Sequence, residues 1–500
     1  MSVARPAASA PWLRVAAYAC LAAVAIACPL VLSEVRPDFL SMSYGVSFLP
    51  YELLGFTGGV AILAAGIFEL RRRRAGDVAS RVAVAVPCLL ALHFVTLTSE
   101  YAQRRFDYDC YEYAGRALLA GESPYRVGLI YLYPPLTAQV FAAAHEGAAR
   151  VGESFGVAWD RDAVWDRVFY LYQCAQVLLL LGAYFLLLRL GRDMGLLSRW
   201  APLLIGGLLL FDNAVFRTLR HGQINLWVLD LSLIGLVWAR RRPAVAGIAI
   251  ALAAHVKLYP LLLIFPLLFC SRIPAAAWAL AAAGGVALAG SDWGRDGSLW
   301  SQYALLASSG FPGEVAFRNN SLHSMAFNTA RLVFGGNGGG AEVRWAVRLG
   351  TLAFGAWTLL RFAQRERIRR HAGTPEADAR CFAAHGADAL AFALLASPSV
   401  WEHHYVMALP LALLACVARG AERPGLVGLG LFLMLGMPTF DLFPFGYHRF
   451  AGMLLLWLAT SPRGEAAWLA PIAQAGGSED SAAVSLPTSP GASDSARSVR

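Results

Sequence analysis

The chain has 500 residues, of which 57% are hydrophobic and 15% are charged, and its mean hydropathy is +0.52. A soluble globular protein carries roughly 25% charged residues, so this composition excludes a single soluble domain and indicates a membrane-embedded protein. The formal net charge of +9 comes mainly from arginines in short segments between apolar runs, which membrane topology explains better than a nucleic-acid partner.

Apolar runs recur along most of the chain, and each predicts a helix in or near the membrane. They lie at residues 11–33, 50–70, 81–99, 167–189, 200–212, 223–239, 244–257, 259–270, 274–291, 342–362, 382–398, 404–418, 425–438 and 448–461. About 12 to 14 spans follow, and the shortest runs must extend into neighbouring segments or form broken pairs. The first run is interpreted as a retained helix because many others follow it.

The predicted fold class is therefore an all-α integral membrane bundle. It occupies residues 1–474 and is followed by a disordered cytoplasmic tail, residues 475–500, which is rich in Ser, Gly and Ala.

Arginine clusters follow alternate runs and predict which side is cytoplasmic. They are Arg71 to Arg74, Arg189 and Arg192, Arg240 to Arg242, and Arg361, Arg365, Arg367, Arg369 and Arg370. The opposite, outer side then receives the long segments 34–49, 100–166, 213–222, 292–341, 399–403 and 439–447. Within the segment 100–166, Tyr111 to Ala120 and Leu136 to Arg150 are amphipathic, and we expect both to be helices lying in the interface plane.

Polar residues in or beside apolar runs are costly and indicate function. On the predicted topology they gather at the outer face. They are Asp107, Asp109, Arg217, Arg220, His221, His255, Lys257, Arg318, Glu402, His403, His404, His448 and Arg449. Such a group of cations suits an anion, for example a phosphate at the membrane boundary. The alternative is interfacial anchoring of separate Arg and His side chains.

Two acidic residues open the first amphipathic stretch. A helix beginning near Cys110 would have Asp109 as its N-cap, with Glu112 completing a capping box. Asp107 then remains an unpaired carboxylate that could accept a proton from an attacking hydroxyl. The pair also forms an Asp-x-Asp pattern, which binds metal in nucleotide-sugar transferases. No nucleotide sugar is expected on the outer side and the cysteines show no metal-ligand spacing, so no metal or cofactor is expected.

Three other motifs carry polar groups. Pro260, just after Lys257, breaks a helix, which is tolerated where a cavity is lined; a snorkelling lysine is the alternative. Gln223 and Asn225 suit sugar hydroxyls or interhelical hydrogen bonds. The adjacent residues His403 and His404 favour phosphate contact or acid–base work over metal ligation.

These motifs, in this order, resemble those of the bacterial GT-C glycosyltransferases of family 87, which includes mannosyltransferases that use polyprenyl-phosphate mannose. The likeness covers about residues 100–410. The matching pieces are Asp107 to Tyr125, Tyr133-Pro134-Pro135-Leu136, Gly222-Gln223-Ile224-Asn225, Lys257-Leu258-Tyr259-Pro260 after Gly247, Asn320-Ser321-Leu322, and Ser397-Pro398 with Trp401-Glu402-His403-His404-Tyr405.

The resemblance implies a polytopic GT-C helical bundle and an inverting displacement without metal. Asp107 is expected to deprotonate the acceptor hydroxyl while polyprenyl phosphate leaves. The residues expected to contact the donor phosphate are Lys257, His403, His404 and Arg220. Those expected to bind substrate are Gln223, Asn225, Asn320, Glu402 and Tyr133. The segment 126–166 is long and charged, which points to an acceptor other than phosphatidylinositol mannosides.

The expected partners are a polyprenyl-phosphate sugar, a lipid or glycan acceptor and the plasma membrane, with no nucleic acid. Two other functions fit the composition. A transporter or flippase of an anionic lipid or polyprenyl-linked glycan would carry polar residues near mid-bilayer in both halves, but no internal repeat is evident. A structural partner of an envelope assembly complex would use the same motifs only for packing.

Overall fold

A computed structural model describes residues 41–46, 107–126, 131–157, 159–196, 201–210, 212–290, 298–308, 318–335, 340–420, 422–437, 439–462 and 468–469. The predicted runs 11–33, 50–70 and 81–99 and the tail 475–500 lie outside these residues. The described elements are β1 (Ser41–Val46), α5 (Tyr108–Leu119), α6 (Pro135–Ser154), α7 (Arg161–Asp193), α8 (Ala201–Leu210), α9 (Asn213–Arg220), α10 (Asn225–Trp238), α11 (Pro243–Val256), η2 (Tyr259–Leu263), α12 (Ile264–Phe269), α13 (Ile273–Ala289), α14 (Leu299–Ser308), α15 (Leu322–Phe334), α16 (Ala341–Ala372), α17 (Pro375–Ala396), η3 (Glu402–Ala408), α18 (Leu409–Arg419), α19 (Pro424–Leu431), η4 (Phe432–Gly436), β2 (Phe440–Leu442), η5 (Phe445–Tyr447) and α20 (His448–Ala459).

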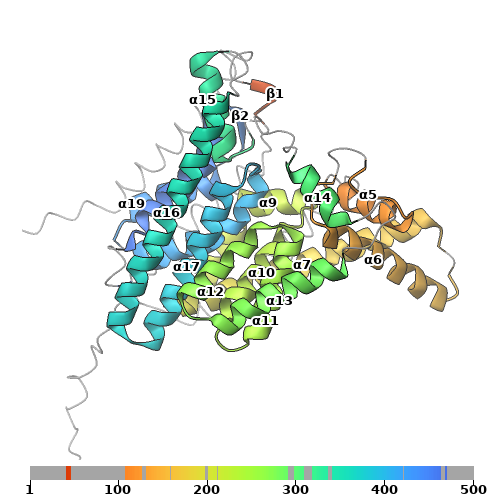
Figure 1. Ribbon diagram of the computed structural model, residues 1–500, viewed down its shortest axis with the longest axis horizontal. Helices are drawn as coiled ribbons and strands as arrows, with labels where there is room; N and C mark the ends of the chain where they lie inside the picture. The colour runs from red at the N-terminus through yellow and green to blue at the C-terminus, as the bar shows by residue number, and fades with distance from the viewer. Residues whose placement is uncertain are drawn as a thin grey trace, which may run out of the picture.

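The predicted all-helical membrane fold is confirmed (Figure 1). Nearly every described element is a helix, and the exception is a short antiparallel pairing of β1 with β2. Each apolar run within the described residues became a helix or a pair of helices, with ends displaced by a few residues at most positions. The hydrophobic pattern identified these helices because the backbone must satisfy its own hydrogen bonds where water is absent.

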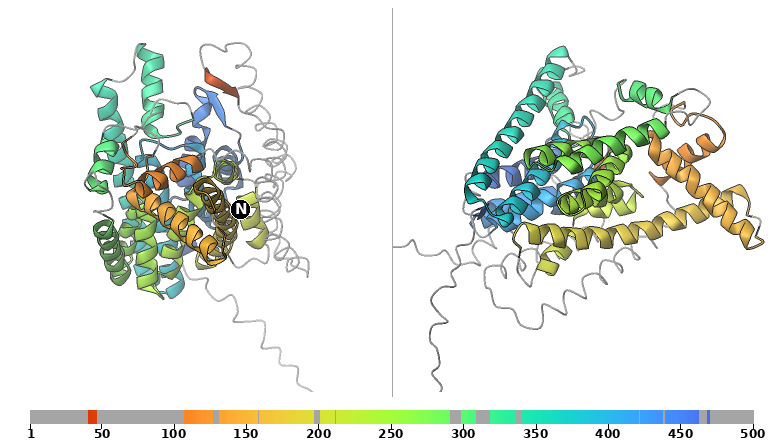
Figure 2. Two further views of the ribbon diagram at one scale, coloured as in Figure 1. Left: turned by 90° about the vertical axis from the view of Figure 1, so that its right-hand side faces the viewer. Right: turned by 60° about the horizontal axis from the view of Figure 1, so that its bottom comes forward.

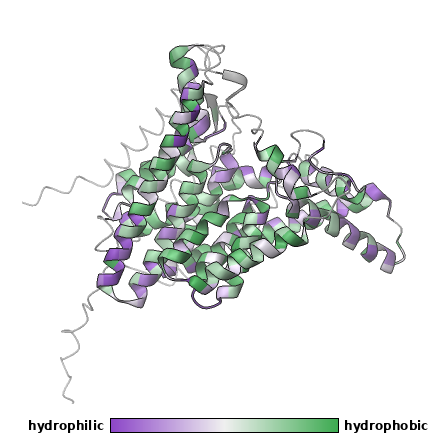
Figure 3. Ribbon diagram, viewed as in Figure 1, coloured by the Kyte–Doolittle hydropathy of each residue, from purple (hydrophilic) through white to green (hydrophobic). Residues whose placement is uncertain are grey.

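Two described helices are long and apolar enough to cross a membrane alone, namely α7 and α17. A bent pair, α8 with α9, would make a third crossing. Several other apolar helices are shorter, between 10 and 17 residues. The expectation of broken and shortened runs is therefore confirmed, while the total of about 12 to 14 spans stays a prediction. Apolar residues dominate the central helices, and polar ones gather at the lower end of α16 and on α6 (Figure 3).

Helices α10 and α11 form an antiparallel pair, which defines two ends of the bundle. Helix α10 begins at Asn225 and α11 ends at Val256, and the two pack against each other. Each has 14 residues, a length of about 21 Å. The segment that joins them, with Arg240 to Arg242, therefore lies at the end away from Asn225 and Lys257. We call these the arginine end and the Asn225 end.

Helix α11 also packs closely on α13, through a small residue. A Cβ atom added at Gly247 would lie 2.5 Å from Trp278 Cβ and 2.6 Å from the carbonyl oxygen of Ala275. Small residues let membrane helices approach in this way, where apolar burial gives little driving force. Gly247 therefore fixes α11 against α13, and with it the position of Lys257.

The predicted amphipathic stretches are helical, as α5 and α6. They pack together beside the start of the long helix α7 (Figure 2). Their location in the interface plane stays a prediction.

Three details differ from the sequence predictions. Residues 213–222 contain helix α9, and 292–341 contains α14 and α15, where only connecting segments were expected. Helix α16 continues to Ala372, so the arginines expected in a connecting segment are helical. Arg361 and Arg365 are buried in the bundle against Asp388. The apolar run ended at residue 362 because the arginines interrupted it, although the helix continues.

Candidate functional site

The first helix of the site begins earlier than predicted. Helix α5 starts at Tyr108, so Asp107 and not Asp109 occupies the N-cap position, and its side chain makes no capping hydrogen bond. Glu112 pairs with Arg116, at 2.7 Å, instead of completing a capping box. Asp109 is exposed in the first turn. The Asp107 carboxylate is thus not used to cap the helix.

Asp107 is held against the turn between α9 and α10, more than 100 residues away in sequence. Its backbone N–H donates to the carbonyl oxygen of His221 at 3.1 Å. The side-chain amide of Gln223 donates to its carboxylate. Asp107 is only half-buried, whereas Gln223 is buried. The carboxylate is therefore partly exposed, while the residue behind it is buried and fixed.

Two tyrosines orient the amide of Gln223. The Tyr133 hydroxyl donates to Gln223 Oε1 at 3.0 Å, and the Tyr111 hydroxyl lies 3.3 Å from the same oxygen. Burial raises the pKa of both Tyr111 and Tyr133 above the ordinary value, so both hydroxyls keep their protons. Because Oε1 faces these donors, the amide nitrogen must face Asp107. Tyr111 lies within the motif Asp107 to Tyr125, but the sequence did not predict this role for it.

The turn that carries Gln223 is supported from α7. Gly222 has φ +62°, a left-handed conformation that glycine adopts without strain. The Tyr172 hydroxyl donates to the Gly222 carbonyl at 2.7 Å, and Gln176 Nε2 donates to the Gln223 carbonyl at 2.8 Å. Sequence reasoning missed Tyr172 and Gln176. A signal was available, because Tyr172 and Gln176 are four residues apart and so share one face of the helix.

Lys257 lies beside the ring of Tyr133. It follows the end of α11 in extended backbone, and η2 begins at Tyr259, so the predicted break is present. Its Nζ donates to Asn225 Oδ1 at 2.6 Å and lies 5.4 Å from the centre of the Tyr133 ring. Asp107 is within electrostatic reach. The side chain is 9% exposed, so its ammonium is held inside the protein and does not extend to bulk water.

The composition of the chain also distinguishes Lys257 from its other cationic residues. Lys257 is the only lysine of the chain, which otherwise uses arginine for its basic side chains. An ammonium differs from a guanidinium in being compact, strongly hydrated and able to rotate its donors. One lysine among so many arginines points to a position where that compact charge is required.

The two histidines complete the Asn225 end. Asn225 Nδ2 donates to the His403 carbonyl at 3.1 Å. The ring of His403 lies 4.7 Å from that of His404 and 6.4 Å from that of His221, and both His403 and His404 are within electrostatic reach of Lys257. The structure therefore brings together most of the predicted site, from five separate segments. We call Asp107, Tyr133, Gln223, Asn225, Lys257, His403 and His404 the polar cluster.

Comparison with protein families gives a match to glycosyltransferase family 87 over residues 131–398. That span is more than half of the chain. The chain belongs to glycosyltransferase family 87. With its apolar helices, it is a membrane glycosyltransferase that must bind a sugar donor and an acceptor. No curated protein matches the chain.

The family 87 match covers most of the polar cluster but not all of it. Tyr133, Gln223, Asn225 and Lys257 lie within the matched residues, whereas Asp107 precedes them and the histidines follow them. The hydrogen bonds of Gln223 to Asp107 and of Asn225 to His403 join the outlying residues to the matched ones. Family membership therefore assigns no role to Asp107, which has to be argued from its position.

A second group of charges lies beside the polar cluster of this glycosyltransferase. Glu402 Oε1 is 3.2 Å from Arg217 Nε, and Thr439 donates to the other carboxylate oxygen. Burial favours the neutral acid, but Arg217 and Arg449 outweigh it and lower the pKa of Glu402 to about 2. Glu402 is thus a buried carboxylate already engaged by protein groups, which suits positioning of η3.

The remaining predicted residues are distributed around these two groups. Arg220 ends α9 and is within electrostatic reach of His221. Asn320 is buried, its backbone N–H donates to the Val400 carbonyl at 2.7 Å, and its Oδ1 has no hydrogen-bond partner among the described residues. His255 lies apart from both groups, because its Nε2 contacts the Ala283 carbonyl on α13 at 2.8 Å.

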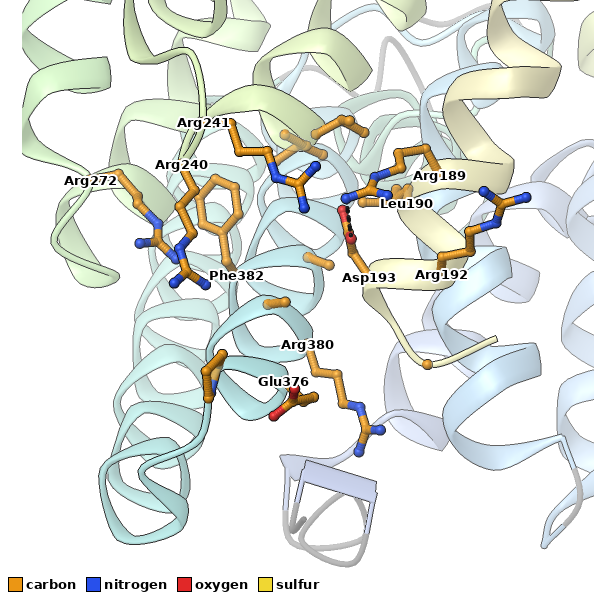
Figure 4. Close-up of a pocket in the computed structure, with 16 residues that line it drawn as sticks. Arg189, Leu190, Arg192, Asp193, Arg240, Arg241, Arg272, Glu376, Arg380 and Phe382 are labelled. Atoms are coloured by element: carbon orange, nitrogen blue, oxygen red, sulfur yellow. Dashed lines mark ion pairs between the residues drawn. The ribbon is translucent and has the colours of Figure 1, made fainter. Parts of the chain in front are cut away.

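A cavity of about 280 Å³ lies at the arginine end of this glycosyltransferase (Figure 4). Its charged lining residues are Arg189, Arg192, Asp193, Arg240, Arg241, Arg272, Glu376 and Arg380. None of the polar cluster lines it. Arginines from two of the predicted cytoplasmic clusters therefore meet at one end of the bundle, as the alternation of spans predicted.

Proposed function

We propose that this family 87 glycosyltransferase moves a hexose, in particular mannose, from a polyprenyl-phosphate sugar to a lipid or glycan acceptor. The observation that carries the proposal is the half-buried Asp107 carboxylate within electrostatic reach of Lys257, which is itself within reach of the imidazoles of His403 and His404. A base and a group of cations are what a displacement at a sugar phosphate requires. A membrane-bound acceptor and donor fit a site at one end of an apolar bundle.

The proposed reaction is a single displacement with inversion at the anomeric carbon. The acceptor oxygen forms a bond to that carbon while its proton passes to Asp107. The bond between the anomeric carbon and the phosphate oxygen breaks, and its electron pair leaves with polyprenyl phosphate. Gln223 holds the Asp107 carboxylate in place, and Tyr133 in turn orients the amide of Gln223.

The cations act on the leaving group. Negative charge grows on the phosphate as its bond to sugar breaks, and fixed positive groups lower the energy of that state. Lys257 is the main candidate. His403 and His404 are within electrostatic reach of it, and because burial lowers the pKa of His403, the imidazoles would act on the phosphate as hydrogen-bond donors. Arg220 lies beside His221. Gln223, Asn225 and Asn320 have amides suited to sugar hydroxyls, and Asn320 Oδ1 still has an open acceptor position.

We place this chemistry on the outer face of the plasma membrane. The polar cluster lies at the Asn225 end, about one helix length from the arginine end. Arginine-rich ends face the cytoplasm in most multi-pass proteins. A polyprenyl-phosphate donor suits this side because nucleotide sugars are confined to the cytoplasm.

The proposal is tested with the purified full chain in liposomes that contain polyprenyl-phosphate mannose and a membrane lipid extract. We expect mannosylated product together with free polyprenyl phosphate in equal amounts. Movement of the intact donor across the bilayer without any new glycosidic bond would instead support a flippase and contradict the proposal.

Replacement of the only lysine sharpens this test. Lys257→Met removes the charge and keeps the length of the side chain, and we expect kcat to fall about 10²-fold, as for loss of one group that stabilises transition-state charge. Lys257→Arg keeps the positive charge but changes its shape. Its kcat should therefore lie between the kcat of wild type and that of Lys257→Met. Wild-type kcat in Lys257→Met, with the same donor, would remove Lys257 from the reaction.

A further inference from the structure

Four potential metal ligands meet inside the bundle, away from the polar cluster. They are Cys270, Glu366, Cys381 and His385. One ligand atom from each lies within 4.8 Å of those of the other three, and all four residues are buried. Within the described parts of the chain no other such group is found. Because Asp107 and Asp109 do not belong to it, it is unconnected with the Asp-x-Asp pattern.

Three helical segments supply these ligands. Cys270 follows α12, Glu366 lies on α16, and Cys381 and His385 lie four residues apart on one face of α17. Sequence spacing did not indicate the group because its members are separated by up to 115 residues, the interval from Cys270 to His385. A metal bound here would join three helices at the arginine end.

The histidine is poorly satisfied by protein atoms alone. Its ring is fully buried and stacks on Phe362, at 4.2 Å between ring centres. Its Nε2 lies 3.4 Å from Cys381 Sγ, and its Nδ1 has no hydrogen-bond partner among the described residues. Buried polar atoms in folded proteins almost always have a hydrogen-bond partner, so the open Nδ1 position points to a missing ligand.

The ligand chemistry selects among metals. Two thiols, one imidazole and one carboxylate form a four-donor set typical of zinc, whereas magnesium and calcium require oxygen ligands throughout. In a tetrahedral zinc site neighbouring donor atoms lie about 3.3–3.8 Å apart, so the group needs only small side-chain rotations to close. Four protein ligands would leave no open position, which is typical of structural zinc sites.

The surrounding charges favour an occupied site. Two thiolates and one carboxylate around a divalent ion leave one negative charge. Glu366 accepts hydrogen bonds from Arg369 and Arg370, and Arg369 is within electrostatic reach of Cys270. Arg365 is within reach of His385. These arginines would balance the negative charge and orient the Glu366 carboxylate as a ligand.

We infer that Cys270, Glu366, Cys381 and His385 form a structural zinc site that ties α12, α16 and α17 together. The site goes beyond the transferase activity and does not depend on the proposed donor or acceptor. Its neighbours Arg272 and Arg380 line the cavity at the arginine end, so zinc would also fix the wall of that cavity.

The test measures metal in the purified full-length chain after growth with zinc. We expect about one zinc ion per chain, and less than a tenth of that in Cys381→Ser and in His385→Ala. Cys416→Ser is the matched control, because Cys416 is also a buried free cysteine but lies outside the group, and it should retain its zinc. Zinc that stays bound in Cys381→Ser would overturn the inference.

A second measurement uses the unaltered chain and does not depend on how well a variant folds. Cobalt(II) added to metal-depleted chain should give the intense visible bands of a tetrahedral ion and a thiolate charge-transfer band. Absence of both bands would overturn the inference, as would a disulfide between Cys270 and Cys381 in freshly isolated membranes.

Discussion

Asp107→Asn should lower kcat/KM for sugar transfer by 10²-fold or more, because general-base catalysis contributes about 10²–10⁴-fold. Asparagine has nearly the size of aspartate but cannot accept the acceptor's proton. It can still pair with the Gln223 amide through its own carbonyl oxygen, so α5 should stay docked on the α9–α10 turn. The loss should therefore appear in the chemical step, with little change in the amount of folded protein.

The control for this variant is two residues away. Asp109 has the same carboxylate, lies on the same helix and is exposed, so Asp109→Asn should keep activity within a few-fold of wild type. Transfer should be measured under single-turnover conditions, so that donor binding and chemistry are separated. Equal activity of Asp107→Asn and wild type would remove Asp107 as the base, even if the chain is a family 87 transferase.

Asp388→Asn should have the largest effect on stability, lowering the free energy of unfolding by roughly 3–5 kcal/mol, as expected when one partner of a buried ion pair is removed. The Asp388 carboxylate accepts from Arg361 at 2.7 Å and from Arg365 at 2.5 Å, and both guanidinium groups are buried. Trp457 Nε1 also donates to it, at 2.7 Å. The variant leaves two buried positive charges without a counter-ion and loosens α16, α17 and α20 together.

Glu146→Gln serves as the comparison, because its pairing with Arg150 is on the surface, where the two side chains are 53% and 78% exposed. Exposed ion pairs contribute about 0–1 kcal/mol, so its unfolding should be close to that of wild type. The measurement is denaturant unfolding in detergent, followed by tryptophan fluorescence. If Asp388→Asn unfolds like Glu146→Gln, the buried ion pair does not hold these helices together.

Much of the fold follows from the hydrophobic pattern. Long apolar stretches have only one way to satisfy their backbone in a membrane, so runs such as 223–239 and 244–257 became α10 and α11 with few changes. The pattern failed where a helix carries charge. Helix α16 extends ten residues beyond its apolar run because Arg361 and Arg365 are neutralised by Asp388, which is distant in sequence.

The sequence indicated which residues belong to the candidate site, but it could not indicate the contacts between them. The motifs marked Asp107, Gln223, Lys257 and His403, since polar residues at the ends of apolar runs are rare and costly. No pattern along the chain could show that Tyr111 and Tyr133 orient the Gln223 amide, or that Arg217 engages Glu402, because these contacts join separate helices. The capping box at Asp109 was wrong because α5 starts two residues earlier than expected, at Tyr108 and not near Cys110.

The closeness of Asp107 to Lys257 supports the whole functional account, and cross-linking tests it most directly. Asp107→Cys is treated with a short reagent that joins a thiol to an amine, and peptides are identified by mass. Because the chain has no other lysine, a link from position 107 to Lys257 is unambiguous. We expect that link, and none from Arg192→Cys at the arginine end. Linkage from Arg192→Cys but not from Asp107→Cys would place the carboxylate and the ammonium at opposite ends of the bundle and contradict the account.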